Sequence, residues 1–490
     1  MNHLSFERYS IQPTQQSLIG ENVEDSEFLQ YARCCAQSSY SAILLSGGRP
    51  PVDGESRYSI AARAPLASFR SKGHRCTVRI LDREIHLDGN PLDIMDQLMG
   101  SFRTDFPLVI PPFSGGALGY FAYDLKNSIE RLPQTARDDL DLPDIVLFWP
   151  GQILVHDRIE KKLRALSLSI RDRAESSLTS GKAHEAGFLP DSSPLPREVA
   201  TVKEELSSPF QVGDLQSNFS HSEYIRAVQK VRRYIREGDV YQVNLSQRYR
   251  FPFHGDGFRL WESLFAMNPA PFYAFIHAGD HQVLSTSMER FLLRKGDCIE
   301  TRPIKGTRKR GQTPEEDAAL SRELVESTKD DAELSMIVDL LRNDLGRVCS
   351  ARSIRVAEHK RLESYQNVHH LVSIVTGRLR AETTYGKLLA ATFPGGSITG
   401  CPKIRAMEII DELEPNVRHV YTGSIGYLGW HENLDLNIAI RTALIRKGTC
   451  YFSVGGGIVY DSCEEDEYQE TLHKGRTLFQ LIEKIGAKVP

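Results

Sequence analysis

The sequence predicts a two-part fold built from both helices and β-strands. Residues 1–170 alternate short apolar runs with turn-forming residues, which is typical of strands. Residues 219–490 alternate helical and strand patterns. The chain has 490 residues, more than one hydrophobic core usually serves, so two domains are expected.

Composition and charge narrow the class of protein. The chain is 40% hydrophobic and 25% charged, as folded globular proteins are. A net charge of −4, from 60 basic and 64 acidic residues, does not indicate a nucleic-acid partner. The eight cysteines show no CxxC pair or zinc spacing, so they are expected to be reduced thiols. There is neither a signal pattern nor an apolar run of about 18 residues, so we expect a cytoplasmic protein without a membrane partner.

The N-terminal part, residues 1–170, is expected to be mainly β. Helices are few, and Asp93–Phe102 is one candidate. The glycine-rich run 115–121 predicts a strand that bends or packs closely against another backbone. Further strands are expected at Ala42–Leu45, Tyr58–Ala61, Thr77–Leu81 and Ile153–His156. Residues 171–218 are rich in Ser, Gly, Pro and charge, which predicts a linker or mobile segment at the domain boundary.

The C-terminal part begins near Phe219 with a helix expected over Tyr224–Glu237, capped by Ser222 and ended by Gly238. Asp461 and Ser462 are expected to cap a later helix. The other expected helices are Asp330–Val348, Lys403–Glu414 and Glu464–Ile485. The expected strands are Asp239–Ser246, Tyr273–His277, Gln282–Ser287, Tyr421–Tyr427, Ile438–Ala443 and Tyr451–Ile458.

The stretch PIKGTRKRG, residues 303–311, is the first candidate for chemistry. Its cations Arg308, Lys309 and Arg310 would lower the pKa of a nearby amine and attract an anion. Lys305, held neutral there, could act as a nucleophile. Glu289, at a strand end, lies a short chain distance before it. A solvated basic loop is the alternative interpretation.

Carboxylates on two expected helices form the second candidate. Glu333 lies near the start of one helix, while Glu467, Glu470 and Lys474 share one face of another. Such acids suit Mg²⁺, which takes few protein carboxylates and keeps waters. The alternative is ordinary surface acids, with an i, i+4 ion pair between Glu470 and Lys474.

Three further segments could hold an anion. The loop 394–403 is glycine-rich and enters a helix, with Pro402 expected in its first turn, so free N–H groups would face a carboxylate or phosphate. Arg441 stands among apolar residues of an expected strand and needs a partner, such as a ligand carboxylate. Gly455–Gly457 at a strand end would expose bare backbone N–H groups.

Together, five segments in this order resemble the chorismate-utilising enzymes. They are PIKGTRKRG, DLLRNDLGRV, GGSITGCPKIRAMEIIDELEP, YTGSIGYLGW and SVGGGIVYDSCEEDEYQET. SMERF at 287–291 is similar to the family's SPERF motif, with Met288 in place of proline and Glu289 kept. The resemblance covers residues 219–488 and extends loosely over the N-terminal part. It implies an α+β fold like that of anthranilate synthase component I, with large antiparallel β-sheets packed face to face and helices on the outside. Residues 219–490 would then be the chorismate-binding catalytic domain.

The resemblance also implies a role for each site residue. Glu333 and Glu470 would hold Mg²⁺, with Glu467 as a further contributor. Glu289 would be the general acid and Lys305 the nucleophile. The residues implied to surround the substrate are Arg441, Lys474, His370, Ser397, Thr399, Tyr421, Gly455, Gly456 and Gly457.

Lys305 also bears on which family reaction is expected. Anthranilate synthases usually carry alanine at this position, whereas aminodeoxychorismate synthases carry PIKGT. The resemblance therefore implies conversion of chorismate and ammonia to 4-amino-4-deoxychorismate through a covalent lysine intermediate, for 4-aminobenzoate and folate synthesis. Nothing in the chain resembles a glutaminase Cys/His pair, so a separate glutamine amidotransferase subunit would supply ammonia. The alternatives are anthranilate synthase component I and a non-catalytic binding or regulatory subunit.

A pocket for tryptophan between the two parts is also implied by the resemblance, and a plain interdomain packing surface is the alternative. The matching positions are Ser46, Glu55, Ser56, Arg57, Tyr58, Pro271, Phe272 and Tyr273.

Overall fold

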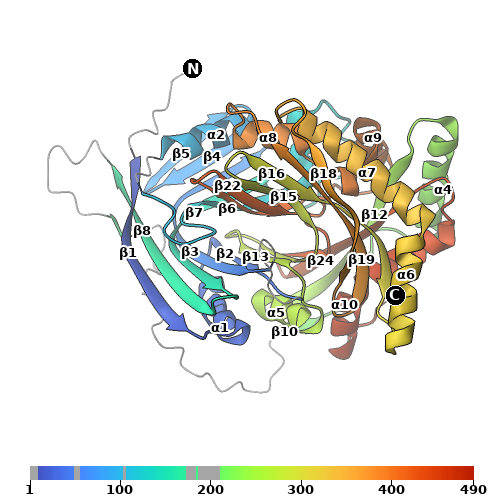
Figure 1. Ribbon diagram of the computed structural model, residues 1–490, viewed down its shortest axis with the longest axis horizontal. Helices are drawn as coiled ribbons and strands as arrows, with labels where there is room; N and C mark the ends of the chain where they lie inside the picture. Colours follow the sequence, from blue (N-terminus) through green and yellow to red (C-terminus); the bar gives the residue numbers. More distant parts are fainter. Residues whose placement is uncertain (1–8, 49–55, 103–105, 173–183, 186–209, 490) are drawn as a thin grey trace.

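Antiparallel strands make up most of the molecule, seen here in a computed structural model (Figure 1) that describes residues 9–48, 56–102, 106–172, 184–185 and 210–489. The strands of the N-terminal part are β1 (Tyr9–Glu21), β2 (Ser41–Leu45), β3 (Tyr58–Lys72), β4 (Arg75–Ile80), β5 (Arg83–Asp88), β6 (Gly116–Phe121), β7 (Ile145–Asp157), β8 (Lys162–Asp172) and β9 (His184–Glu185). Those that follow are β10 (Phe210–Val212), β11 (Gln216–Ser217), β12 (Gln242–Gly255), β13 (Phe272–His277), β14 (Gln282–Ser287), β15 (Arg290–Lys295), β16 (Cys298–Arg302) and β17 (Ile304–Lys309). The last are β18 (Arg355–Ser364), β19 (Val368–Arg378), β20 (Gly400–Cys401), β21 (Ser424–Gly429), β22 (Asn433–Asn437), β23 (Thr442–Arg446) and β24 (Thr449–Ile458).

Helices cover the outside of these sheets (Figure 1). They are α1 (Asp25–Ala36), α2 (Pro91–Ser101), α3 (Lys126–Ile129), α4 (His221–Glu237), α5 (Gly257–Met267), α6 (Pro314–Glu326), α7 (Thr328–Gly346), α8 (Tyr385–Thr392), α9 (Lys403–Leu413) and α10 (Glu464–Lys484). Helices α6 and α7 lie against β17 and β19, and α10 lies against β24 and α4. The α+β fold expected from the sequence is thus confirmed. Among the described helices, none is both long and apolar enough to cross a membrane.

The N-terminal and C-terminal parts of the chain share a sheet. Strand β2 pairs with β13, so that Leu45 lies opposite Tyr273, and β6 pairs with β21. A Cβ atom on Gly119 of β6 would collide with the Val146 carbonyl oxygen, which confirms the close backbone packing expected for 115–121. Large aromatic side chains, among them Trp149 and Trp261, are fully buried in two hydrophobic clusters that hold these layers together.

Most elements expected in the N-terminal part are confirmed. The strands expected from residues 42, 58 and 153 lie within β2, β3 and β7. The strand expected from residue 77 and the helix expected from residue 93 match β4 and α2, except that each observed element ends one residue earlier. Of the linker expected at 171–218, residues 173–183 and 186–209 lie outside the described part of the chain. Its described ends belong to strands β8, β10 and β11.

The ends of the helices differ from expectation in three places. Ser220, not Ser222, caps α4, because the side chain of Ser220 accepts the Glu223 N–H while the Glu223 carboxylate accepts the Ser220 N–H. Helix α10 begins after Cys463 without a side-chain cap, since the Ser462 hydroxyl instead donates to Glu467. Pro402 stands at the N-cap of α9, one position before its first turn.

The strand expected over 438–443 is wrong. Strand β22 ends at Asn437 and β23 begins at Thr442, so Arg441 lies in the connection with a positive φ of 52°. Tyr421 likewise precedes its strand, because β21 begins only at Ser424. The segments around Arg441 and Tyr421 are apolar enough to be predicted as strands, but the structure places both residues in connections between strands.

Candidate active site

The lysine singled out by the sequence lies on β17 with its amine directed at α7 and β24. Its Nζ is 3.9 Å from Oε2 of Glu333, and the two side chains are 16% and 20% exposed. The same Nζ lies 3.3 Å from where a Cβ atom on Gly457 would be. Gly306 has a φ of 73° beside a register shift in β17, and its α-carbon faces Leu324 and Asp330 closely. The glycine is therefore required to bring the Lys305 strand against the helices.

The neighbouring cations do not serve an anion. Arg308 donates to Glu323 at 2.8 Å and to Asp330 at 3.2 Å, while Arg310 binds both oxygens of Asp317 at 2.7 Å. The side chain of Lys309 is 73% exposed. The expectation that the cluster attracts an anionic ligand is wrong for the two arginines, because carboxylates of α6 and α7 already neutralise them.

Glu289 lies in the short connection between β14 and β15 and is only 6% exposed. The Ser397 hydroxyl donates to its Oε1 at 2.6 Å. Burial raises the pKa of Glu289 to about 7, against the lowering effects of the Ser397 hydroxyl, the Lys305 amine and the Ile304 N–H. A carboxyl group with a pKa near neutrality is suited to give up a proton as a general acid.

Two carboxylates of α10 meet over the glycine segment of β24. Oε2 of Glu467 and Oε1 of Glu470 both lie 3.1 Å from the position of a Cβ atom on Gly456, so any other residue would crowd them. Oε2 of Glu467 is buried without a hydrogen-bond partner. Burial, together with the charge of Glu470, raises the pKa of Glu467 to about 7. For Glu470 burial opposes ionisation, but its ion pair with Lys474 prevails and the pKa is lowered.

The fit of these acids to a metal ion is partial. Within the described residues, no three His, Cys, Asp or Glu side chains are gathered closely enough to form a metal site by themselves. Glu333 lies against Lys305, whereas Glu467 and Glu470 face Gly456. A pair of carboxylates with one buried, unpartnered oxygen still matches Mg²⁺, which uses one or two protein carboxylates and completes its shell with water and substrate oxygens.

Arg441 is a half-buried cation close to this cluster. Burial lowers its pKa to about 10, and its guanidinium donates to the Lys474 carbonyl oxygen. No carboxylate of the described residues forms an ion pair with it. Lys474 in turn donates to the Gly455 carbonyl oxygen at 2.9 Å. A half-buried guanidinium that no protein carboxylate neutralises is suited to bind the carboxylate of a ligand.

The remaining expected residues lie around the same centre in different roles. His370 of β19 shares a hydrogen bond with Thr307 across β17 at 2.9 Å. Thr399 is fully buried, and its hydroxyl donates to the Gly395 carbonyl oxygen at 3.1 Å, so it holds the glycine-rich loop in place. Tyr421 is buried, and burial raises its pKa to about 12, with the charge of Arg441 acting in the opposite direction.

One residue of the centre escaped sequence reasoning. Gln242 begins β12, is fully buried, and has no hydrogen-bond partner for either polar atom of its side chain. Its Nε2 lies 2.7 Å from the Cβ position of Gly457, the glycine that also faces Lys305. Leaving such an amide without hydrogen bonds costs about 1–3 kcal/mol, so a group of the ligand is expected to hydrogen-bond to it. No pattern in the sequence distinguishes this glutamine from the other polar residues of β12.

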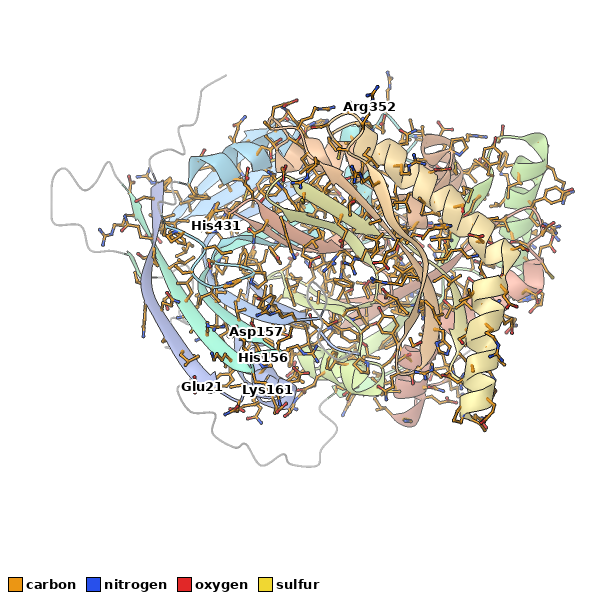
Figure 2. All side chains as sticks on the ribbon, viewed as in Figure 1. Glu21, His156, Asp157, Lys161, Arg352 and His431 are labelled. Atoms are coloured by element: carbon orange, nitrogen blue, oxygen red, sulfur yellow. The ribbon has the colours of Figure 1, made fainter. Side chains whose placement is uncertain are left out.

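A separate cavity of about 300 Å³ lies at the shared sheet. Every described position expected to surround tryptophan lines it, namely Ser46, Ser56, Arg57, Tyr58, Pro271, Phe272 and Tyr273, whereas Glu55 lies outside the described residues. Arg57 is held by Asp157 at 2.7 Å, at the end of β7 (Figure 2). Arg290, Asp435 and Asn437 are further polar residues that line this cavity.

Comparison with known proteins agrees with this geometry. A model of the chorismate binding enzyme family matches residues 50–480. Aminodeoxychorismate synthase component 1 of Bacillus subtilis is 36% identical, over 94% of this chain and 95% of its own. Anthranilate synthase component 1 of Cereibacter sphaeroides is 38% identical, over 88% and 87%. The solved structure of anthranilate synthase component I from Streptococcus pneumoniae is 30% identical and superposes with a TM-score of 0.73, over 95% of this chain and 99% of that one.

Proposed function

The chain belongs to the chorismate binding enzyme family, and we propose that it converts chorismate and ammonia to 4-amino-4-deoxychorismate. The observation that carries this proposal is Lys305, whose Nζ lies 3.9 Å from Glu333 inside the cluster of acids and beside Gly457. Anthranilate synthesis is the second candidate, because relatives of both kinds share similar identity, 36% and 38%. An amine in the reaction centre favours synthesis of 4-amino-4-deoxychorismate, since the amine supplies a nucleophile that anthranilate synthesis does not need.

Substrate binding follows from the distribution of charge. Chorismate carries two carboxylates, and Arg441 is a half-buried cation that forms no ion pair with a carboxylate of the described residues. It would bind one carboxylate in two parallel hydrogen bonds. Glu470 and Glu333, with Glu467 nearby, would hold Mg²⁺ over the other carboxylate, and Lys474 would add charge there. When bound, Mg²⁺ would neutralise that carboxylate and polarise the ring system attached to it.

The chemistry is then divided between two residues. The amine of Lys305 forms a C–N bond to the ring while the C4–O bond breaks, and the ring double bonds shift to accommodate both changes. Glu289 gives its proton to the departing hydroxyl, which leaves as water. Ammonia next attacks the ring and the lysine amine departs, so the second shift of double bonds restores free Lys305 and yields the amino product.

Ammonia needs a binding group and a source. The Gln242 amide, unsatisfied and facing the same glycine as Lys305, offers a carbonyl oxygen to accept an ammonia N–H. A separate glutamine amidotransferase subunit is proposed as the source, and the product would feed 4-aminobenzoate and folate synthesis. The cavity lined by Ser46, Arg57 and Phe272 is proposed to hold tryptophan, because an apolar slot with a few polar groups suits an aromatic amino acid.

The deciding experiment is identification of the product. Purified protein is incubated with chorismate, an ammonium salt and Mg²⁺, and the products are separated and weighed by mass spectrometry. We expect 4-amino-4-deoxychorismate, and a fluorescent anthranilate product alone would refute the proposal. Chorismate without ammonia should also leave a covalent adduct on Lys305, detectable in the mass of the denatured protein and absent from Lys305→Ala.

A further inference from the structure

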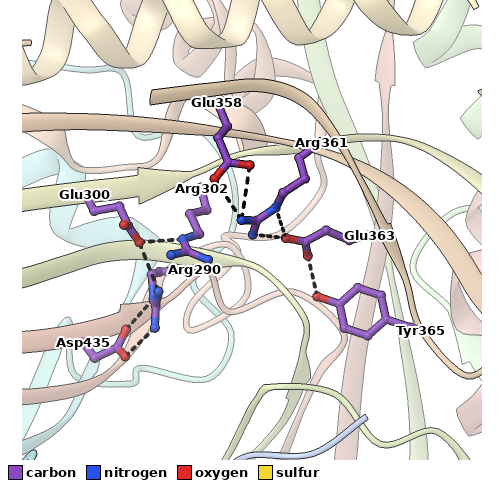
Figure 3. Close-up of polar contacts among 8 residues, drawn as sticks. All are labelled: Arg290, Glu300, Arg302, Glu358, Arg361, Glu363, Tyr365 and Asp435. Atoms are coloured by element: carbon purple, nitrogen blue, oxygen red, sulfur yellow. Dashed lines mark hydrogen bonds and ion pairs between the residues drawn. The ribbon is translucent and has the colours of Figure 1, made fainter. Parts of the chain in front are cut away.

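Figure 3 shows a series of charged side chains that includes Arg290, Glu300 and Arg302, which are near Glu289 and Lys305 in the chain. Arg290 directly follows Glu289 in the chain, and Arg302 precedes Lys305 by three residues. Both arginines belong to the hairpin of β15 and β16, where they are cross-strand partners. The backbone segments that carry the acid and the amine therefore leave this hairpin from the same end.

Two arginines opposite one another in a buried hairpin repel each other. Glu300, also on β16, lies between them (Figure 3), and its Oε1 accepts from Nη1 of Arg290 at 3.1 Å and from Nε of Arg302 at 2.5 Å. A single carboxylate oxygen thus joins the two cations and offsets their repulsion. Its side chain is 19% exposed, so water screens these contacts only partly.

The bridge that Glu300 forms between the two arginines is anchored on the Arg290 side. Arg290 binds both oxygens of Asp435 on β22 at 3.0 Å, and its guanidinium lies 4.9 Å from the centre of the Phe272 ring. With Asp435, Glu300 and an aromatic ring on three sides, the arginine has little freedom. Movement of Glu300 would therefore be transmitted mainly to Arg302 and to the strand that carries Lys305.

The strand end next to Arg302 also contacts Glu289. The N–H of Ile304, between Arg302 and Lys305 in the chain, acts on the Glu289 carboxyl group. A change in the relative position of the two strand ends would therefore alter both the distance between acid and amine and the polar contacts of the acid.

We propose that Glu300 is a positioning residue for the reaction, and that its bridge between Arg290 and Arg302 fixes Glu289 relative to Lys305. This inference rests on the proposed function only in taking these two residues as the reacting groups. Glu300 itself touches neither substrate nor reacting atoms. A displacement of about 1 Å at a reacting group lowers the rate by about a hundredfold, so a small loosening of the bridge has a measurable effect.

The test compares Glu300→Gln with Glu300→Asp and with a matched control. Glutamine keeps the size of the side chain but removes the charge. Aspartate keeps the charge but is one methylene shorter, so its carboxylate lies farther from the two arginines. Glu358→Gln is the control, because this acid belongs to the same network but contacts Arg361, at 3.3 Å, and is 47% exposed. For each protein, kcat and KM are measured from chorismate consumption, together with Tm and the rate of adduct formation on Lys305 in a single turnover.

We expect both Glu300 variants to lose about ten- to a hundredfold in kcat and in adduct formation, with KM for chorismate within about twofold of wild type. Glu358→Gln should match wild type in all of these. Unchanged kcat in a folded Glu300 variant would overturn the proposal, and so would equal losses in Glu358→Gln. If Glu300→Gln does not fold, Glu300→Asp decides alone. The two failures can be told apart. A wild-type product of anthranilate would refute the proposed function, whereas 4-amino-4-deoxychorismate formed with unchanged kcat in a Glu300 variant would refute the positioning role alone.

Discussion

Replacing Ser397 by alanine should shift the pH dependence of the reaction in a direction fixed by one hydrogen bond. In the wild type, Glu289 must be protonated to act as an acid, and its pKa is about 7. The rate constant kcat/KM should therefore be highest at low pH and fall as pH rises through about 7, by about tenfold for each unit beyond it. The Ser397 hydroxyl donates to Oε1 of Glu289 at 2.6 Å and stabilises its charged form.

The size of the shift follows from the strength of that contact. A hydrogen bond to a charged group contributes about 1.5–3 kcal/mol, and one pKa unit corresponds to about 1.36 kcal/mol. Removing the hydroxyl should therefore raise the pKa of Glu289 by about one to two units. The alkaline limb of the kcat/KM profile moves to higher pH by the same amount.

The assay is chorismate consumption at saturating ammonium and Mg²⁺ from pH 5.5 to pH 9.5, a range of about four units around the expected midpoint. Thr392→Val is the matched control, since this buried hydroxyl on α8 donates to the Leu388 carbonyl oxygen and not to Glu289. That variant should keep the wild-type midpoint. Glu289→Gln should lose about 10²–10⁴-fold in rate and show no limb. A limb that stays in place in Ser397→Ala, or moves to lower pH, would refute the assignment of Glu289 as the titrating acid.

Four further predictions concern other parts of the molecule. Because the folded pKa of Glu289 exceeds its ordinary value of 4.5, its contribution to stability is present below about pH 4.5 and is lost as pH rises through about 7, so Glu289→Gln should have a higher Tm than wild type at pH 8 in thermal melts. Lys305→Ala should lose about 10³-fold in 4-amino-4-deoxychorismate formation, and an undiminished rate in product assays would contradict its role as nucleophile. Glu470→Gln should abolish the increase in Tm that Mg²⁺ gives the wild type, since the carboxylate pair over Gly456 is broken; an equal increase in both proteins would exclude that pair as the site. Tryptophan at 100 times its Kd should stabilise the wild type by about 2.7 kcal/mol in denaturant titrations, and no such effect would mean that the cavity beside Arg57 does not bind it.

The sequence identified candidate residues that the fold brings near one another more readily than it identified their surroundings. Lys305, Glu467 and Glu470 could be named because they lie in long motifs, and Glu289 because it lies in SMERF. Helix α10 could be predicted in nearly its full length, because its apolar face repeats with helical period. Motifs and helical periodicity involve residues that are close in the chain, so they can be recognised from a single sequence.

The errors arose where tertiary contacts decide. Arg441 looked like a strand residue, but the chain turns there with a positive φ, and apolar neighbours do not reveal that. The arginines at 308 and 310 looked free, yet their partners Glu323, Asp330 and Asp317 come from helices that only the fold brings near. Gln242 was missed because period-two alternation predicted a half-buried strand, whereas the first residues of β12 are buried on both faces.

Under the proposed function, the arrangement around Gly457 would let one fold serve more than one chorismate reaction. The acids of α10, Arg441 and Glu289 would bind a dicarboxylate and protonate a leaving group, whatever the nucleophile. Lys305 enters this site from a different strand, with its amine beside the glycine that also faces Gln242. An alanine at 305 would leave the binding and protonating groups in place and remove only the covalent route, so that ammonia would have to attack the ring directly. On these two proposals, the choice of reaction would depend on one side chain on β17, held in register with Glu289 by the charges of the adjoining hairpin.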